Sequence, residues 1–209
     1  MTLESPGLAP VVYVIDDDSS IRGALSNLIR SIGLQAEVFA STSDFLKTKR
    51  GEGPCCLVLD VRLPGVSGLD FQAELTKSNS NIPIIFITGH GDIPMSVQAM
   101  KGGAIEFLTK PFRDQDLLDA IGVGLARDRA RRKQDRELRT LRELFERLSP
   151  REREIMIEVV RGRLSKQIAG DIGISEVTVK IHRSNMMRKM QAASLPELGR
   201  MADKLKLVS

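Results

Sequence analysis

The chain has 209 residues, enough for one or two domains that each bury a core, and with 28% charged and 4% aromatic residues its composition is that of a soluble globular protein. No apolar stretch approaches the roughly 18 residues of a membrane span, and the N-terminus lacks the basic and apolar segments of a secretory signal, which excludes a membrane protein and predicts a cytoplasmic one. Residues 1–125 carry 10 Lys and Arg against 15 Asp and Glu, a net charge of −5, whereas residues 126–209 carry 21 against 12, a net charge of +9.

This charge division indicates an acidic regulatory half and a basic half that binds nucleic acid. Basic helical faces are often only solvated, so the charge alone leaves both interpretations open. Residues 1–10 contain two prolines and a glycine, and we expect them to form a disordered N-terminus.

Five apolar runs follow, and they predict strands at residues 11–15, 35–39, 55–60, 82–87 and 104–109. Apolar positions at helical spacing lie between them and predict helices that begin at Asp18 or Ser19, Ser41, Gly68, Pro94 and Asp114. Five strands that alternate with five helices predict an α/β fold with a doubly wound, five-stranded parallel sheet. We expect the helix from Gly68 to turn Leu69, Ala73 and Leu75 toward the sheet, while Val97 and Met100 recur at helical spacing on the next helix.

Polar residues stand at the ends of four of these strands. They are Asp16, Asp17 and Asp18 after the first strand, Asp60 in the third, Thr88 after the fourth and Lys110 after the fifth. Parallel strands end at one edge of the sheet, which is where open α/β sheets bind ligands. Several carboxylates at one edge repel one another unless a divalent cation lies among them, so we expect Mg²⁺ or Mn²⁺. An isolated Asp here is most often a helix cap and an isolated Lys is usually solvated. These ordinary roles do not explain why acid, acid, hydroxyl and ammonium groups follow one another at the strand ends.

The order Asp16-Asp17, Asp60, Thr88 and Lys110-Pro111 resembles the receiver domain of bacterial response regulators over residues 11–125, and residues 88–95 are similar to its FixJ branch. The resemblance implies that Asp60 accepts phosphate and that Mg²⁺ is bound by Asp16, Asp17, Asp60 and the Arg62 main-chain carbonyl. It also implies that Thr88 and Lys110 bind the phosphoryl oxygens, that Phe107 is the aromatic switch partner of Thr88, and that a cis peptide bond precedes Pro111. The residue types suit this chemistry, because a carboxylate attacks phosphorus poorly unless cations neutralise both partners.

The two cysteines are adjacent in a predicted strand. Neighbouring strand residues point to opposite faces, so Cys55 and Cys56 are poorly placed to form a disulfide with each other. We expect both to be small buried apolar residues in a reducing compartment, with a redox role as the alternative.

Residues 126–147 are expected to be a helical linker. Residues 126–137 have high helix propensity but no apolar stripe, which predicts an exposed helix. Apolar residues then return at steps of three and four, at Leu138, Leu141, Phe145 and Leu148. This stripe is either a dimer seam or a surface that packs on one of the domains, and its length of less than two heptads favours packing.

A second, all-α domain of four helices is predicted over residues 148–209. Ser149, Pro150 and Glu152 mark the first helix, whose core side holds Ile155, Met156, Val159 and Val160. Ser165 is expected to cap the second helix, which turns at Gly173. Ser175 is expected to cap the third helix, at 176–190, and Ser194 the fourth. Two short helices joined by a turn with glycine are typical of a helix-turn-helix, whose second helix enters the major groove.

Residues 148–152, 166–169, 174–182 and 186–190 resemble the LuxR-type helix-turn-helix output domain. With the receiver pattern ahead of it, the chain resembles a NarL/FixJ-type response regulator along nearly its whole length. On the helix 176–190 we expect Val179, Met186 and Met190 to face the core. We expect Lys180 and Ser184 to contact base edges, Ile181 to make an apolar contact, and Lys166, Thr178 and Arg188 to contact phosphates. His182 is interpreted as structural or as a phosphate contact, since no Cys or acid nearby completes a metal site.

These features predict a phosphorylation-dependent transcriptional regulator, whose only catalysis is its own phosphotransfer and dephosphorylation. The expected partners are a cognate histidine kinase, promoter DNA, RNA polymerase and, on phosphorylation, a second copy bound through the helix from Pro94 and the strand 104–109. One alternative is a DNA-binding regulator controlled without phosphorylation. Another is an aspartate-nucleophile phosphatase, which normally has a second acid two residues after the nucleophile, where this chain has Arg62.

Overall fold

The computed structural model describes residues 9–78, 80–89 and 92–207, and the chain divides into two compact units, Met1–Arg132 and Lys133–Ser209. Most of the predicted disordered N-terminus and part of the FixJ-like segment, His90 and Gly91, lie outside the described residues. The predicted domain limits, after residues 10, 125 and 147, stay predictions. The described part contains no helix that is both long and apolar enough to span a membrane.

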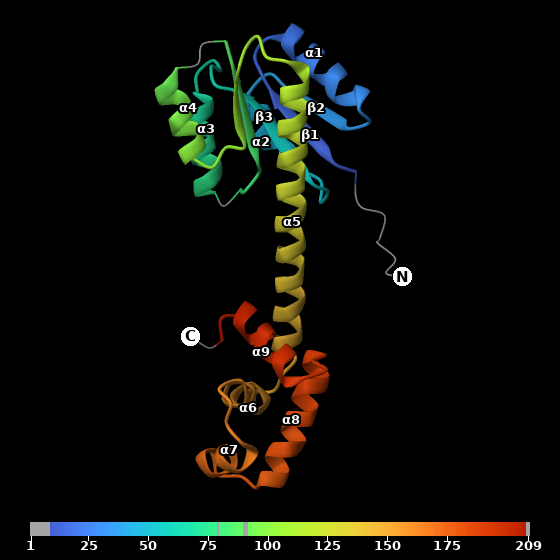
Figure 1. The fold of residues 1–209 in the computed structure, drawn as a ribbon, viewed down its shortest axis with the longest axis vertical. Helices are drawn as coiled ribbons and strands as arrows, with labels where there is room; N and C mark the ends of the chain where they lie inside the picture. The colour runs from blue at the N-terminus through green and yellow to red at the C-terminus, as the bar shows by residue number, and fades with distance from the viewer. Residues whose placement is uncertain (1–8, 79, 90–91, 208–209) are drawn as a thin grey trace. The chain divides into compact units, whose positions relative to one another are not determined.

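The first unit is built on a sheet of five parallel strands, as predicted, and the strands lie in the order β2-β1-β3-β4-β5 (Figure 1). The strands are β1 Val11–Ile15, β2 Gln35–Phe39, β3 Cys55–Asp60, β4 Ile84–Thr88 and β5 Glu106–Thr109. β3 lies between β1 and β4, with Leu59 opposite both Ile15 and Phe86. The carboxyl ends of β1 and β3 are therefore neighbours at one edge of the sheet.

Two strands begin later than predicted, for reasons of hydrogen bonding. β4 begins at Ile84 rather than residue 82, because Pro83 has no N–H to donate and only its carbonyl joins the sheet, accepting from the Leu57 amide at 2.8 Å. β5 begins at Glu106 rather than residue 104, because the Ala104 amide donates to the Ala99 carbonyl at the end of the preceding helix.

Helices cover both faces of the sheet, as Figure 1 shows. They are α1 Ser19–Ser31, α2 Thr42–Lys47, α3 Gly68–Lys77, α4 Ile93–Lys101 and α5 Asp114–Glu146. α1 and α5 pack on one face and α2, α3 and α4 on the other. Cys55 belongs to one of these two cores and Cys56 to the other, which confirms that the two side chains point to opposite faces.

The sheet-facing side of α3 differs from the prediction. Phe71 and Gln72 are buried and Ala73 is exposed, because the buried stripe runs through Gly68, Phe71, Gln72 and Leu75 at steps of three and four. Leu69 and Leu75 are buried as predicted.

α4 is held to the sheet by few buried side chains. Ala99 is its one fully buried residue among those described, and Val97 and Met100 are 44% and 46% exposed. The Gln72 side chain donates to the Ala99 carbonyl at 3.2 Å. α4 therefore presents an apolar surface that the described residues leave uncovered.

α5 continues through the predicted linker, and its first part is not simply exposed. Asp128 is 0% exposed and accepts a hydrogen bond from the Cys55 amide at 2.9 Å. Arg132 donates to Asp128 at 2.5 Å and to the Glu52 carbonyl at 3.0 Å. Most of residues 126–137 are exposed on a helix as predicted, but the burial of Asp128 was not predicted, because this segment is attached by a carboxylate and its hydrogen bonds and not by an apolar stripe.

The second unit contains the end of α5 and four helices, α6 Pro150–Val160, α7 Ser165–Ile172, α8 Glu176–Met190 and α9 Leu195–Lys204. Ser149, Ser175 and Ser194 cap α6, α8 and α9 as predicted. Ser165 does not cap α7: Leu164 is the N-cap, and its amide donates to the Gln167 side chain at 2.9 Å.

The end of α5 packs on the core of this unit. Leu144 and Leu148 are buried there with Phe145 partly buried against them, which supports the interpretation of the apolar stripe as a packing surface. Val179, Met186 and Met190 of α8 are fully buried in the same core, as predicted.

Candidate functional site

Three carboxylates meet at the carboxyl edge of the sheet. Asp16 and Asp17 directly follow β1, and Asp60 is the last residue of the neighbouring β3. One oxygen from each carboxylate lies within 4.8 Å of the others. Asp16 and Asp60 are buried, whereas Asp17 is exposed. The sheet order thus brings together two acidic segments that are more than 40 residues apart in the sequence.

Lys110, the residue after β5, bridges two of these carboxylates. Its Nζ lies 2.7 Å from Asp16 Oδ2 and 2.8 Å from Asp60 Oδ2. Burial on its own would lower the pKa of Lys110, but the hydrogen bonds to Asp16 and Asp60 raise that pKa above its ordinary value. Burial raises the pKa of Asp16, although Lys110 opposes this shift. A charged ammonium group thus lies beside Asp60, where it can neutralise the charge of an incoming anion.

Backbone donors orient the acids around this ammonium group. The Asp18 amide donates to Asp16 Oδ1 at 2.9 Å, and the Arg62 amide donates to Asp60 Oδ1 at 3.0 Å. Three carboxylates with oxygen donors suit Mg²⁺, which prefers oxygen ligands and commonly binds through a few carboxylates and a phosphate. The donor set therefore fits the expected metal.

Two residues whose contacts at this edge were not predicted from the sequence, Arg22 and Gly68, help to shape it. Arg22 of α1 donates to the main-chain carbonyls of Asp16 and Asp17 at 2.8 and 2.9 Å. Its place one turn into α1 is the only sequence signal, and many surface arginines share it. Gly68, at the start of α3, lies so close to β3 that a Cβ there would overlap the Asp60 carbonyl oxygen. The Gly68 amide donates to the Val61 carbonyl at 2.8 Å, which closes the loop that carries Arg62.

The other expected receiver residues lie on β4 and β5. Thr88 is fully buried, and its carbonyl accepts a hydrogen bond from the Lys110 amide at 2.7 Å. Phe107 is half-buried, and the centroid of its ring lies 6.3 Å from the centroid of the Phe86 ring. The Lys110–Pro111 peptide bond is cis. All the residues expected at this edge therefore come from the ends of β1, β3, β4 and β5 or from the loops that follow them, except Phe107, which lies inside β5.

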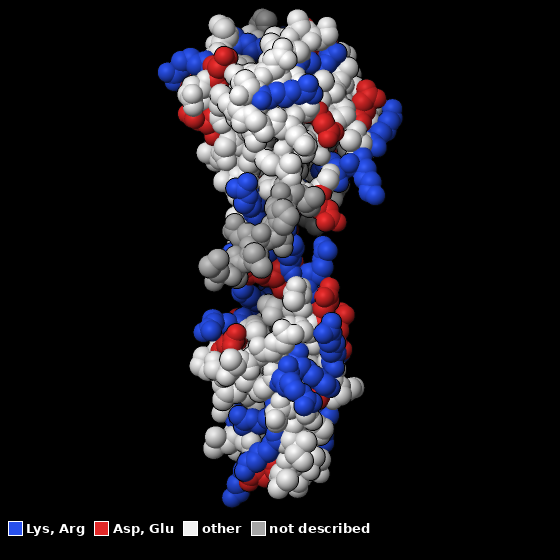
Figure 2. Space-filling view, turned by 90° about the vertical axis from the view of Figure 1, so that its right-hand side faces the viewer, with Lys and Arg blue, Asp and Glu red and all other residues white. Residues whose placement is uncertain are grey.

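The second unit presents a basic surface on α7 and α8. The exposed side chains include Lys166 on α7 and Lys180, Ile181, Ser184 and Arg188 on α8, and Ile181 is 56% exposed. Thr178 is half-buried, and its hydroxyl lies 2.8 Å from that of the N-cap Ser175. Figure 2 shows Lys and Arg side chains spread over this unit, with fewer acidic side chains among them. Such a surface can attract the phosphates of a duplex.

Ion pairs and hydrogen bonds fix the two helices of this surface. Arg183 of α8 donates to the Ser165 hydroxyl of α7 at 2.9 Å. Lys189 of α8 pairs with the buried Glu152 of α6 at 2.7 Å, and Glu152 also accepts from the Ser149 amide. These interactions hold α8 against α6 and α7. Neither the Arg183 nor the Lys189 contact was predicted from the sequence.

Comparison with known proteins finds two family matches in the chain. Residues 12–122 match the family described as response regulator receiver domain, and residues 146–202 match the luxR family of bacterial regulatory proteins. The first match includes every residue of the acidic edge, and the second includes α6 to α8 and most of α9.

Individual proteins are similar to the chain over nearly its whole length. Nodulation protein W of Bradyrhizobium diazoefficiens is 54% identical over 195 residues, which are 93% of this chain and 86% of that protein. Response regulator protein TodT of Pseudomonas putida is 48% identical over 198 residues, 95% of this chain and 87% of TodT. Among solved structures, response regulator StyR aligns with a TM-score of 0.86 at 50% identity and covers 94% of this chain and 100% of StyR.

Proposed function

The chain belongs to the family of two-component response regulators that join a receiver domain to a LuxR-type DNA-binding domain, and on that premise we propose that phosphorylation of Asp60 controls its binding to promoter DNA. It is a two-component transcriptional regulator. The observation that carries the proposal is Lys110, whose Nζ contacts both Asp60 and Asp16 at the edge where three carboxylates converge. No observation favours control without phosphorylation or a phosphatase activity.

Phosphotransfer would begin with the phosphohistidine of a sensor kinase. An oxygen of Asp60 forms a bond to phosphorus as the bond between phosphorus and the kinase histidine breaks. Asp16, Asp17, Asp60 and the Arg62 carbonyl would hold Mg²⁺, which when bound neutralises charge on the transferring group. Lys110 supplies a second cation to the phosphoryl oxygens, and Thr88 supplies a hydroxyl donor. The Arg62 amide keeps the Asp60 carboxylate oriented.

Phosphorylation would add a charge of about −1.5 to −2 at the end of β3. We expect Thr88 to turn toward this charge and Phe107 to turn into the space behind it. The change would reach α4, which has one fully buried residue among those described and an exposed apolar surface. We therefore expect α4 and β5 to form a dimer contact on activation, which would cover Val97 and Met100.

Dimerisation would place two DNA-binding domains on one duplex. Two α8 helices would enter successive major grooves, about 34 Å apart. Lys180, Ile181 and Ser184 would contact base edges, and Lys166, Thr178 and Arg188 would contact phosphates. RNA polymerase is the expected further partner, and the cytoplasm, where kinase and promoter meet, is the expected location.

The proposal is tested with acetyl phosphate as phosphoryl donor and Asp60→Asn as the variant. Wild type should take up one phosphate per chain in the presence of Mg²⁺ and bind its promoter more tightly, while Asp60→Asn should do neither. Sedimentation with beryllofluoride should show a dimer for wild type at tens of micromolar. Equal gains in DNA binding for wild type and Asp60→Asn would contradict the proposal.

A further inference from the structure

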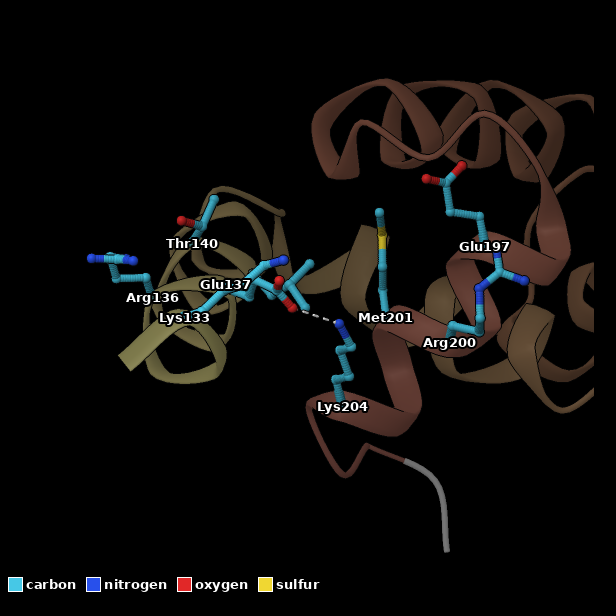
Figure 3. Close-up of a pocket in the computed structure, with 9 residues that line it drawn as sticks. Lys133, Arg136, Glu137, Thr140, Glu197, Arg200, Met201 and Lys204 are labelled. Carbon is cyan, nitrogen blue, oxygen red and sulfur yellow. Dashed lines mark hydrogen bonds and ion pairs between the residues drawn. The ribbon is translucent and has the colours of Figure 1, made fainter. Parts of the chain in front are cut away.

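A cavity of about 640 Å³ lies in the second unit, between the end of α5 and α9. Its α5 side consists of Lys133, Arg136, Glu137, Thr140 and Leu141, and its α9 side of Glu197, Arg200, Met201 and Lys204. Figure 3 shows Lys204 of α9 pointing toward Glu137 of α5, whereas Arg136 points away from α9. The volume is within the usual range of about 300–1,000 Å³ for small-molecule sites. None of these residues has a role in the functions proposed above.

The charges around this cavity favour an anion. Four of the nine side chains are cationic and two are acidic. Both acids already have partners, because Glu137 pairs with Lys204 at 3.0 Å and Glu197 accepts from the Ala193 amide at 2.8 Å. The side chains of Lys133, Arg136 and Arg200 make no ion pair or hydrogen bond with any residue that the structure describes, although the charge of Lys133 helps to lower the pKa of Glu137. Cationic groups are therefore available on both sides of the cavity.

The apolar side chains of the cavity add a second requirement. Leu141 and Met201 are half-buried at its wall, and Met201 packs against the core of the unit. An inorganic anion would leave this apolar surface in water, whereas a ligand with a ring or hydrocarbon part would cover it. Arginine suits a phosphate, because its planar guanidinium group forms paired hydrogen bonds with phosphate oxygens.

We propose that this cavity binds a small organic phosphate of the nucleotide class. Its phosphates would contact Lys133 and Arg200 and compete with Glu137 for Lys204, and its ring would lie against Leu141 and Met201. Because such a ligand contacts both helices, it would tie the end of α5 to α9. The proposal rests neither on phosphorylation of Asp60 nor on base reading by α8. Ligand binding in this cavity and the function proposed above can therefore fail independently of each other.

The test uses the full chain, ATP as probe and a buffer without Mg²⁺, which removes the metal from the acidic edge. The first variant is Lys133→Ala with Arg200→Ala, one cation from each side. The matched control is Arg139→Ala with Arg142→Ala, which removes the same charge from exposed positions of α5 outside the cavity. Alanine suits a helix at all four positions, and thermal unfolding without ligand verifies that each variant is folded.

Calorimetric titration should give a dissociation constant for ATP and wild type below about 1 mM. The first variant should weaken binding by at least about tenfold, as expected for the loss of charge-assisted hydrogen bonds, and the control should stay within about twofold. Equal losses in both variants would show diffuse attraction and overturn the proposal, as would an absence of binding to wild type.

Two further measurements separate the sources of phosphate. Inorganic triphosphate should bind more weakly than ATP, and equal affinities would overturn the role of the apolar wall. A random-sequence duplex should bind the first variant and the control equally well. A selective loss of duplex binding in the first variant, with no ATP binding by wild type, would assign the cavity to DNA phosphates instead and overturn the proposal.

Discussion

The carboxylate of Asp128, in the middle of α5, accepts a hydrogen bond at 2.9 Å from the backbone amide of Cys55, the first residue of β3. The last residue of the same strand is Asp60. One strand thus carries the proposed phosphorylation site at one end and the attachment of α5 at the other. Arg132, the last residue of the first unit, extends this attachment to the Glu52 carbonyl.

Removal of the Asp128 carboxylate should destabilise the first unit. Asp128→Ala leaves the buried Cys55 amide without its acceptor and removes one acceptor from each of two arginines, so the free energy of unfolding should fall by about 2–4 kcal/mol. Asp119→Ala, at an exposed position of the same helix, should cost no more than about 0.5 kcal/mol. Urea denaturation measures both values, and a similar cost for the two variants would contradict the importance of the Asp128 attachment.

The same carboxylate predicts a pH dependence. Burial would raise the pKa of Asp128, but hydrogen bonds from Arg132, Arg131 and the Cys55 amide lower it overall. A group with a lowered pKa in the folded state contributes stability that is fully present above its ordinary pKa of about 3.9 and is lost as the pH falls through the folded value. Below about pH 4, wild type should therefore lose stability more steeply than Asp128→Asn. Parallel curves of unfolding free energy against pH would contradict this assignment.

Metal binding should be visible as a gain in stability that depends on Asp17. A saturating excess of Mg²⁺, a hundredfold over its dissociation constant, should stabilise wild type by about 2.7 kcal/mol. Asp17→Asn should abolish this gain and change the metal-free stability little, because Asp17 is exposed. Glu74→Gln, an exposed acid on α3, should keep the full gain. Thermal unfolding with Mg²⁺ and with a chelator distinguishes these outcomes.

Replacement of two glycines by alanine should have opposite effects on stability, because only Gly68 lies where α3 closely approaches β3. Gly68→Ala would place a Cβ against the Asp60 carbonyl oxygen, which should cost about 1–3 kcal/mol and reduce phosphorylation by moving the Arg62 loop. Gly122→Ala, in α5 with open space around it, should instead stabilise the chain by about 0.5–1 kcal/mol. Denaturation and uptake of phosphate from acetyl phosphate test both. Normal phosphorylation of a folded Gly68→Ala variant would show that this packing does not position Asp60.

Two lysines of the second unit should affect DNA binding differently. Lys180→Ala should cost about 1–3 kcal/mol on the operator and little on unrelated sequences, because it removes a base contact. Lys166→Ala should weaken binding to all sequences alike and reduce the slope of log affinity against log salt by about 1. Arg161→Ala, an exposed position at the end of α6, serves as the control. Identical salt slopes and identical specificity for the two lysine variants would contradict the division of roles.

Much of the acidic edge was predictable because its residues follow strands directly. A strand that ends in Asp60 and another that ends before Asp16 must meet once the sheet is parallel and β1 and β3 are neighbours. Arg22 and Gly68 escaped prediction because their roles depend on backbone atoms of another element. Neither a surface arginine nor a glycine at a helix start carries a local signal of what it will contact.

The sequence by itself determined where strands and helices lie and which polar residues stand at their ends, because apolar periodicity and helix caps are local properties of the chain. Only the tertiary structure decided that Lys110 bridges Asp16 and Asp60, that Phe71 rather than Ala73 faces the sheet, and that Asp128 is buried. The physical reason is that each of these outcomes depends on a partner distant in sequence. For Asp128 that partner is a backbone amide 73 residues away, which no pattern within a helix can reveal.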